Sequence, residues 1–184
     1  MSYLENLSLK VSVITVVYNG EKYIEDCVKS VISQTYGNIE YIVIDGGSID
    51  STLSILEKYK SNISCFISEK DKGMYDALNK GINLAKGDII GILNADDMLA
   101  AKDVISNIVT CFKNNNLDAV YGNLNYINPE DANQIIRKWV SKKFTKRDIK
   151  LGWMPAHPTL YLKRELFKRL GNYSLDFGTA ADYE

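Results

Sequence analysis

Apolar residues alternate along the first half of the chain between short continuous runs and stretches with helical spacing. The runs at 11–17, 41–44, 65–67 and 89–93 predict strands, and the continuous β-branched run at 11–17 is expected to be buried on both faces. Between the runs, apolar positions recur every three or four residues and predict helices over 21–34, 51–59, 77–87 and 104–112. Ser48 or Asp50 is expected to cap the second helix.

After residue 116 this rhythm changes. Segments 119–126 and 134–140 predict strands on either side of a turn at Asn128-Pro129, and 164–170 predicts a helix. Repeated strand–helix units predict an α/β fold with a mostly parallel central sheet flanked by helices. The length of 184 residues is typical of one domain. The sequence ends in what reads as the start of a helix, so we expect a single domain over 1–184 that is truncated at its C-terminus.

Composition and charge exclude several classes of protein. Hydrophobic residues make up 46% and charged residues 24% of the chain, as in soluble globular proteins. The net charge is −1 and the cations are spread out, which argues against a nucleic-acid partner. A mild basic cluster favours a solvated face, with contact to anionic lipid or substrate as the alternative; it comprises Lys138, Lys142, Lys143, Lys146 and Arg147.

The cellular compartment follows from the cysteines and the N-terminus. Cys27, Cys65 and Cys111 are far apart and odd in number, which indicates small apolar residues in a reducing compartment. The N-terminus has no signal-peptide pattern, and no apolar run has the roughly 20 residues that a membrane helix needs. We therefore expect a cytoplasmic protein.

Three polar clusters follow predicted strands: YNGE at 18–21, DGGSID at 45–50 and NADD at 94–97. Ligands of open parallel sheets bind at the carboxyl ends of the strands, so the clusters are expected to share one edge. The 45–50 segment alone is equally compatible with a ligand-binding role and with a purely structural role as a tight turn with a helix cap. Adjacent Asp96 and Asp97 repel each other unless a cation compensates, and their hard oxygen atoms suit Mg²⁺ or Mn²⁺.

Four segments together resemble glycosyltransferase family 2, the inverting group with the GT-A fold. They are VSVITVVYNGEKYIEDCVKSVISQTY, EYIVIDGGSIDST, SEKDKGMYDALNKGINLAKGDIIGILNADD and FGTAADYE, which cover nearly the whole chain in order. The resemblance is closest to the bacterial branch that builds polysaccharide repeat units such as O-antigen. It implies a donor-binding half over about 1–98 and an acceptor-side half over about 99–184.

The resemblance also implies roles for individual residues. The base and ribose of a UDP-type donor would be cradled by Thr15, Val17, Tyr18 and Glu21. Asp45 would accept a hydrogen bond from uracil N3–H. Asp96 and Asp97 would hold the metal, with Asp96 also touching the ribose, and Asp182 would be the general base. Two departures matter: Asn94 stands at an aspartate position of the metal motif, and Leu78 replaces a common arginine, so donor contacts would come from Lys72, Tyr75 or Asp76.

The implied reaction is metal-dependent transfer of a sugar from a nucleotide-sugar donor to a saccharide or lipid-linked acceptor. A homodimer and peripheral membrane association through a region beyond residue 184 are compatible with it. His157, the only histidine, is more often structural than functional, and Trp153 suits either the core or a sugar-stacking platform. A sugar nucleotidyltransferase and a non-catalytic nucleotide-sugar-binding module remain alternatives, although the loop after the first strand carries neither GxGxxG nor GxxxxGK[ST].

Overall fold

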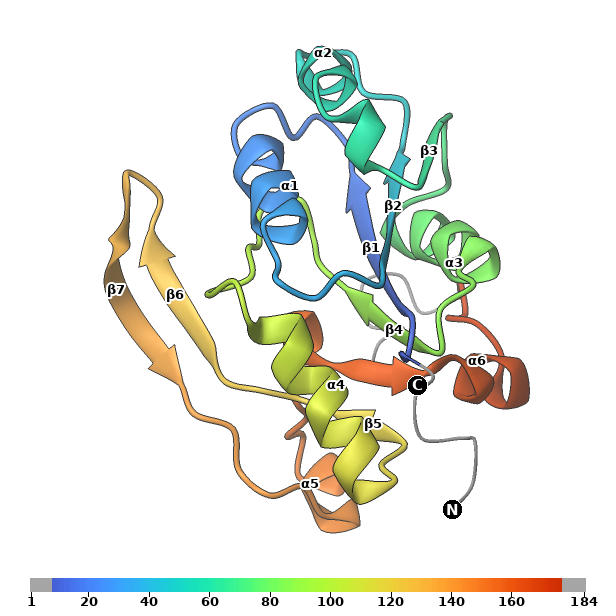
Figure 1. The fold of residues 1–184 in the computed structure, drawn as a ribbon, viewed down its shortest axis with the longest axis vertical. Coiled ribbons are helices and arrows are strands. Elements are labelled where there is room, and N and C mark those ends of the chain that lie inside the picture. The colour runs from blue at the N-terminus through green and yellow to red at the C-terminus, as the bar shows by residue number, and fades with distance from the viewer. Residues whose placement is uncertain (1–7, 177–184) are drawn as a thin grey trace.

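A six-stranded sheet forms the centre of the fold in a computed structural model that describes residues 8–176, apart from the side chain of Ile149. The strand order is β3-β2-β1-β4-β8-β5 (Figure 1). The parallel part comprises β1 (Val11–Val17), β2 (Ile39–Asp45), β3 (Cys65–Ser68) and β4 (Ile89–Ile92). Strand β8 (Tyr161–Lys163) runs antiparallel to both β4 and β5 (Ala119–Val120). The predicted α/β architecture with a mostly parallel sheet is therefore observed.

Helices cover both faces of this sheet. On one face, α1 (Ile24–Ile32), α2 (Thr52–Glu57) and α4 (Val104–Asn115) pack with Val11, Val13 and Val17. On the other face, α3 (Met74–Leu84) and α6 (Arg164–Leu170) pack with Ile14 and Val16. All seven residues of β1 are buried, because a strand covered on both faces has no solvent side.

Strand β8 was not predicted from the sequence, and its position depends on one glycine. Gly91 in β4 lies beneath the ring of Tyr161, where an added Cβ would come within 2.1 Å of the ring carbon Cε1. Tyr161 is almost completely buried as a result. A three-residue segment carries too little periodicity to be recognised alone, and this one becomes a strand by pairing with β4 and β5.

The second half also differs from the prediction around the hairpin. The predicted strand 119–126 is two strands: β5 joins the main sheet, and β6 (Leu124–Asn128) pairs with β7 (Asp131–Trp139) in a separate two-stranded sheet. Helix α5 (Lys146–Lys150) was not predicted, nor were the short 3₁₀ helices η1 (Lys60–Asn62) and η2 (His157–Thr159). The helix expected at 164–170 is confirmed as α6.

Two further expectations concern cysteines and membrane spans. All three cysteines are free thiols, and burial raises the pKa of the Cys27 thiol to about 12, which makes it unreactive at neutral pH. Within residues 8–176, no helix combines the length and the apolar character needed to cross a membrane.

Candidate active site

Hydrogen bonds join the loops that follow β1 and β2 at the carboxyl edge of the sheet. The Asn19 N–H donates to Ser48 Oγ (2.8 Å), and Asn19 Oδ1 accepts from the Ile49 N–H (3.0 Å). The Gly20 N–H donates to Thr52 Oγ1 (2.8 Å). Asn19 has a φ of 51°, a left-handed conformation that asparagine adopts more readily than most residues. The two loops therefore form one connected rim.

Glu21 belongs to this rim. Its Oε2 atom accepts from the Ser51 N–H (2.9 Å), and its own N–H donates to Asp50 Oδ2 (3.1 Å). Asp50 Oδ1 accepts from the Thr52 N–H (3.0 Å), so Asp50 satisfies an amide at the start of α2. Ser48, the other cap candidate, bonds to Asp45 instead. Glu21 therefore holds the two loops together.

Asp45 is completely buried at the end of β2. Its Oδ2 atom accepts from the Gly47 N–H (3.1 Å), the Ser48 N–H (3.0 Å) and the Ser68 hydroxyl (2.6 Å). Its Oδ1 atom accepts from the Ser48 hydroxyl. The carboxylate therefore ties the β2 loop to the end of β3, and Gly47 reaches it with a φ of 84°.

A pocket of about 550 Å³ opens beside this rim, between the ends of β1 and β4 and the start of α3. Its walls include four of the residues singled out in the sequence: Val17, Tyr18, Asn94 and Asp96. Tyr18 is 63% exposed, so its ring is available to a ligand. We call this the edge pocket.

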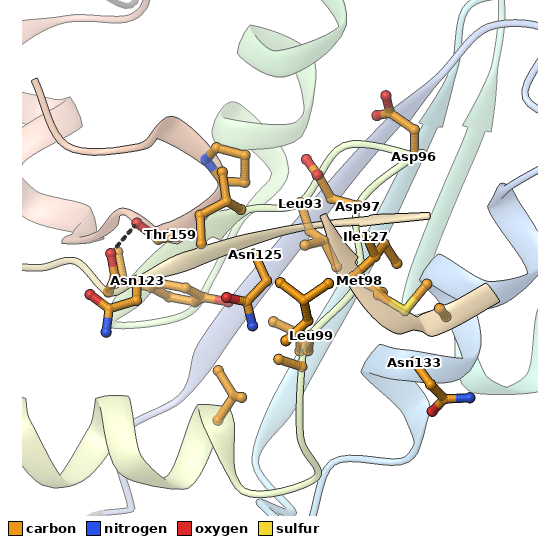
Figure 2. Close-up of a pocket in the computed structure, with 18 residues that line it drawn as sticks. Leu93, Asp96, Asp97, Met98, Leu99, Asn123, Asn125, Ile127, Asn133 and Thr159 are labelled. Carbon is orange, nitrogen blue, oxygen red and sulfur yellow. Dashed lines mark hydrogen bonds between the residues drawn. The ribbon is translucent and has the colours of Figure 1, made fainter. Parts of the chain in front are cut away.

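A second pocket, of about 400 Å³, lies between the end of β4 and the β6–β7 hairpin. Figure 2 shows Asp96 at one end of it and Asn123 with Thr159 at the other, where the Thr159 hydroxyl donates to the Gly122 carbonyl (3.3 Å). Asn125 and Ile127 reach it from β6. We call this the hairpin pocket. Asp96 is on the walls of both pockets, so the two sites meet at one carboxylate.

The pKa of Asp97 and the hydrogen bonding of Asn94 both bear on whether a divalent cation fits at the end of β4. Burial and the charge of Asp96 raise the pKa of Asp97 to about 6, partly offset by a hydrogen bond from the Asn94 side chain. Among the described residues, Asn94 Oδ1 is buried and has no hydrogen-bond donor. A divalent cation would relieve both features, and carboxylate and amide oxygens are the ligands it prefers. The residues present therefore fit such an ion.

The protein ligands are few, however. Among the described residues, no three His, Cys, Asp or Glu side chains come together in a way that could hold a metal ion. Oxygens of a bound diphosphate would have to complete the coordination, as Mg²⁺ sites commonly require.

Other predicted contacts lie outside both pockets. Thr15 is completely buried, and its Oγ1 atom accepts from the Tyr41 hydroxyl (3.2 Å). The Lys72 N–H donates to Asp76 Oδ2 (3.0 Å), and Asp76 pairs with Lys80 (3.6 Å). Neither Lys72 nor Asp76 lines the edge pocket. Asp182 lies outside the described residues.

Asp71 lines the edge pocket and was missed in the sequence. A Cβ at Gly46 would lie 2.5 Å from Asp71 Oδ2, so the missing side chain at Gly46 lets this carboxylate approach the β2 loop. The available signal was an acid between Lys70 and Lys72, two residues before Gly73, which has a φ of 117°.

The remaining two candidates pack against other rings. The Trp153 ring lies 6.5 Å from that of Tyr121 and 6.3 Å from that of Phe144, and Lys142 Nζ lies 4.8 Å from its centre. The His157 ring lies 6.2 Å from that of Tyr173. Neither residue lines the edge pocket or the hairpin pocket.

Solved structures share this fold. S. aureus TarS in complex with UDP superposes with a TM-score of 0.78 at 23% identity, over 95% of this chain and 53% of TarS. The mannosyltransferase PcManGT from Pyrobaculum calidifontis, solved with GDP-Man and Mn²⁺, superposes with a TM-score of 0.70 at 24% identity, over 92% of this chain and 49% of PcManGT. These similarities confirm the predicted fold class.

The sequence comparison identifies the family. Residues 12–173 match glycosyl transferase family 2. An uncharacterized glycosyltransferase of Mycobacterium tuberculosis is 33% identical over 190 residues, which cover 95% of this chain and 66% of that relative. The chain therefore belongs to glycosyl transferase family 2, and it spans just under two thirds of the length of this curated relative.

Proposed function

We propose that this chain carries the nucleotide-sugar site of a metal-dependent inverting glycosyltransferase. It would move a sugar from a UDP-sugar to a hydroxyl of a saccharide or lipid-linked acceptor in bacterial cell-surface polysaccharide synthesis, such as that of O-antigen. The observation that carries the proposal is the position of Asp96, which lines both the edge pocket and the hairpin pocket. A residue at this junction can contact the donor on one side and the region of transfer on the other.

The two pockets suit two parts of the reaction. Both volumes, about 550 and 400 Å³, fall within the roughly 300–1,000 Å³ typical of ligand sites. The nucleoside would occupy the edge pocket, built from residues of the donor half, 1–98. The sugar and the acceptor would occupy the hairpin pocket, to which residues after 98 contribute most of the wall.

Asp96, Asp97 and Asn94 would hold Mg²⁺ or Mn²⁺ together with the donor diphosphate. When bound, the cation would neutralise the charge that develops on the departing diphosphate. Asp96 and Asp97 would orient that diphosphate so that the anomeric carbon faces the hairpin pocket. Asp182 would take the proton of the acceptor hydroxyl as it attacks from the opposite side, which inverts the configuration.

The nature of the base is the least constrained part of the donor. TarS was solved with UDP and PcManGT with GDP-Man, so the fold accommodates both bases. We favour uridine because the family resemblance assigns Asp45 to the uracil N3–H, which would replace the Ser68 hydroxyl as a donor to this buried carboxylate. A cytoplasmic location at the inner face of the plasma membrane suits an enzyme whose acceptor is lipid-linked.

Thermal shift with a panel of nucleotides tests the proposal. UDP with Mn²⁺ at about 100 times Kd should raise Tm by about 5–10 °C, whereas UDP with EDTA, or GDP and dTDP, should raise it less. Asp96→Asn should abolish the increment due to Mn²⁺. Asp26→Asn, the same change at an exposed position of α1, is the control and should keep it. Stabilisation by no nucleotide would refute the donor site.

A further inference from the structure

Residues 134–151 run from β7 to just beyond α5 and concentrate positive charge. This segment, which we call the basic strip, contains seven Lys or Arg residues and one acid, Asp148, so its net charge is +6. The whole chain carries −1, so the remaining residues together carry −7. β7 and α5 lie at the left and lower margins of the molecule in Figure 1, away from α2 and α3. One margin of an otherwise acidic molecule is therefore strongly basic.

Most of these basic side chains form no ion pair with a described residue. Within residues 8–176, Lys142 is the one member of the basic strip in an ion pair, with Asp148. The Arg137 guanidinium lies over the rings of Tyr126 (5.4 Å) and Trp139 (5.8 Å). The other five basic residues are exposed and form no ion pair with a described residue: Lys138, Lys143, Lys146, Arg147 and Lys150.

Large apolar side chains are exposed among these cations. Ile136 is 65%, Val140 74% and Leu151 70% exposed. Ile136 is the extra residue of a bulge in β7, because Arg137 pairs with Tyr126 and Ile135 pairs with Ile127, which are neighbours in β6. Arg137 and Lys138 directly follow Ile136 in the chain, and the Arg137 guanidinium lies over the Tyr126 ring. The basic strip therefore exposes apolar and cationic side chains at neighbouring positions.

We propose that the basic strip binds the surface of an anionic phospholipid bilayer. Lys and Arg close to such a surface are attracted by its negative potential, and interspersed apolar side chains enter the boundary between headgroups and acyl chains. RNA or an acidic polysaccharide would satisfy the charges but would leave Ile136, Val140 and Leu151 in water. The combination of the two kinds of side chain favours the bilayer.

Binding through the basic strip would place the hairpin pocket near the membrane. Ile135 of the basic strip lines that pocket, and the next residue, Ile136, is 65% exposed. A lipid-linked acceptor would then meet the hairpin pocket without leaving the bilayer. This consequence rests on the proposed function, but bilayer binding itself does not.

Co-sedimentation with vesicles tests the proposal. The protein should bind phosphatidylcholine vesicles that contain about 30% phosphatidylglycerol, and should bind pure phosphatidylcholine at least tenfold more weakly, since anionic lipid supplies the attraction. Lys138→Ala/Lys143→Ala/Lys150→Ala should lower the partition coefficient about 100-fold, because each cation near the surface contributes about fivefold. Lys142 is retained because it pairs with Asp148. Lys58→Ala/Lys102→Ala/Lys113→Ala, an equal charge change at exposed lysines elsewhere, should have little effect.

A second variant tests the apolar contribution. Ile136→Ser/Val140→Ser should lower vesicle binding about tenfold and leave binding to an RNA homopolymer unchanged. Equal binding to both kinds of vesicle, or equal losses in the two triple variants, would overturn the proposal. So would RNA binding without vesicle binding, which would assign the strip to an acidic polymer. UDP-induced thermal shifts of the same variants show whether the donor site is intact, so a failure here and a failure of the proposed function are distinguishable.

Discussion

Asp45 has both carboxylate oxygens occupied by donors from its own loops: two backbone amides and the hydroxyls of Ser48 and Ser68. A carboxylate offers about four lone-pair sites, so this one is saturated. A uracil N3–H that reaches Asp45 would therefore have to replace a donor. Ser68 is the candidate, because Ser68 is exposed and Ser48 is buried. Asp45 thus anchors the loops, whether or not it also selects the base.

Asp45→Ala tests both roles. Four buried or part-buried donors would lose their acceptor, so the free energy of unfolding in urea should fall by about 3 kcal/mol. If Asp45 also contacts the base, UDP affinity measured by calorimetry on the folded variant should fall by about 1–3 kcal/mol.

Ser68→Ala is the matched control for these two roles. It removes one donor and leaves the carboxylate bound by the others, so the stability loss should be about 1 kcal/mol or less. UDP affinity should stay equal or rise, because a site on Asp45 becomes available. Unchanged UDP affinity in Asp45→Ala would remove this residue from the base pocket.

Asp182 is the proposed general base, and its substitution separates chemistry from binding. Asp182→Asn keeps the shape of the side chain but cannot accept the proton. In the full-length protein, turnover should fall by about 10²–10⁴ while UDP affinity stays near wild type. Near-normal turnover would contradict the assignment of Asp182 as the general base. Wild-type protein that binds UDP and transfers no sugar would indicate a non-catalytic module.

Helix α5 shows how one side chain can define an element. The Asp148 carboxylate accepts from the Thr145 N–H (2.7 Å) and the Thr145 hydroxyl (2.6 Å) and pairs with Lys142. The spacing Thr145-x-x-Asp148 is that of a capping box, a signal that could have predicted this helix. These partners, with Lys142 first, lower the pKa of Asp148 to about 2.

The stability contributed by Asp148 should depend on pH. The folded pKa lies below the unfolded value of about 3.9, so the contribution is complete above about pH 4 and is lost as the pH falls toward 2. Asp148→Asn should therefore lower Tm at pH 7, and the difference from wild type should shrink between pH 4 and 2. Asp118→Asn, the same change at an exposed aspartate that pairs with Lys163, should have a much smaller effect on Tm at pH 7. A difference that is constant with pH would contradict this account.

Local pattern predicted the helix near the end of the described chain but not the strands around residue 120. The helix expected near 164–170 is observed as α6, and Gly171, which follows it, has a φ of 96°. Segment 119–126 reads as one strand, but β5 pairs with β8 while β6 pairs with β7, and the chain turns between them. Which partner a short strand finds is not encoded in its own residues.

At the scale of the whole molecule, the carboxyl edge of the sheet brings together loops that are distant in sequence. The order β2-β1-β4 places the loops after residues 45, 17 and 92 next to one another, as the βαβ pattern predicts. Val17, Tyr18, Asn94 and Asp96 meet in the edge pocket for this reason. Thr15 does not, because its side chain points into the core from within the strand.

The sequence by itself determined the α/β class, the parallel strands, the shared edge and the acidic pair Asp96-Asp97, because periodicity and strand ends are local properties. The tertiary structure decided which face each side chain takes and which segments meet across the sheet. It directed Glu21 and Asp45 into the hydrogen bonds of the loops, brought Asp71 against Gly46, and made Asp96 the boundary between two pockets. Those outcomes depend on contacts between residues tens of positions apart, which no pattern along the chain specifies.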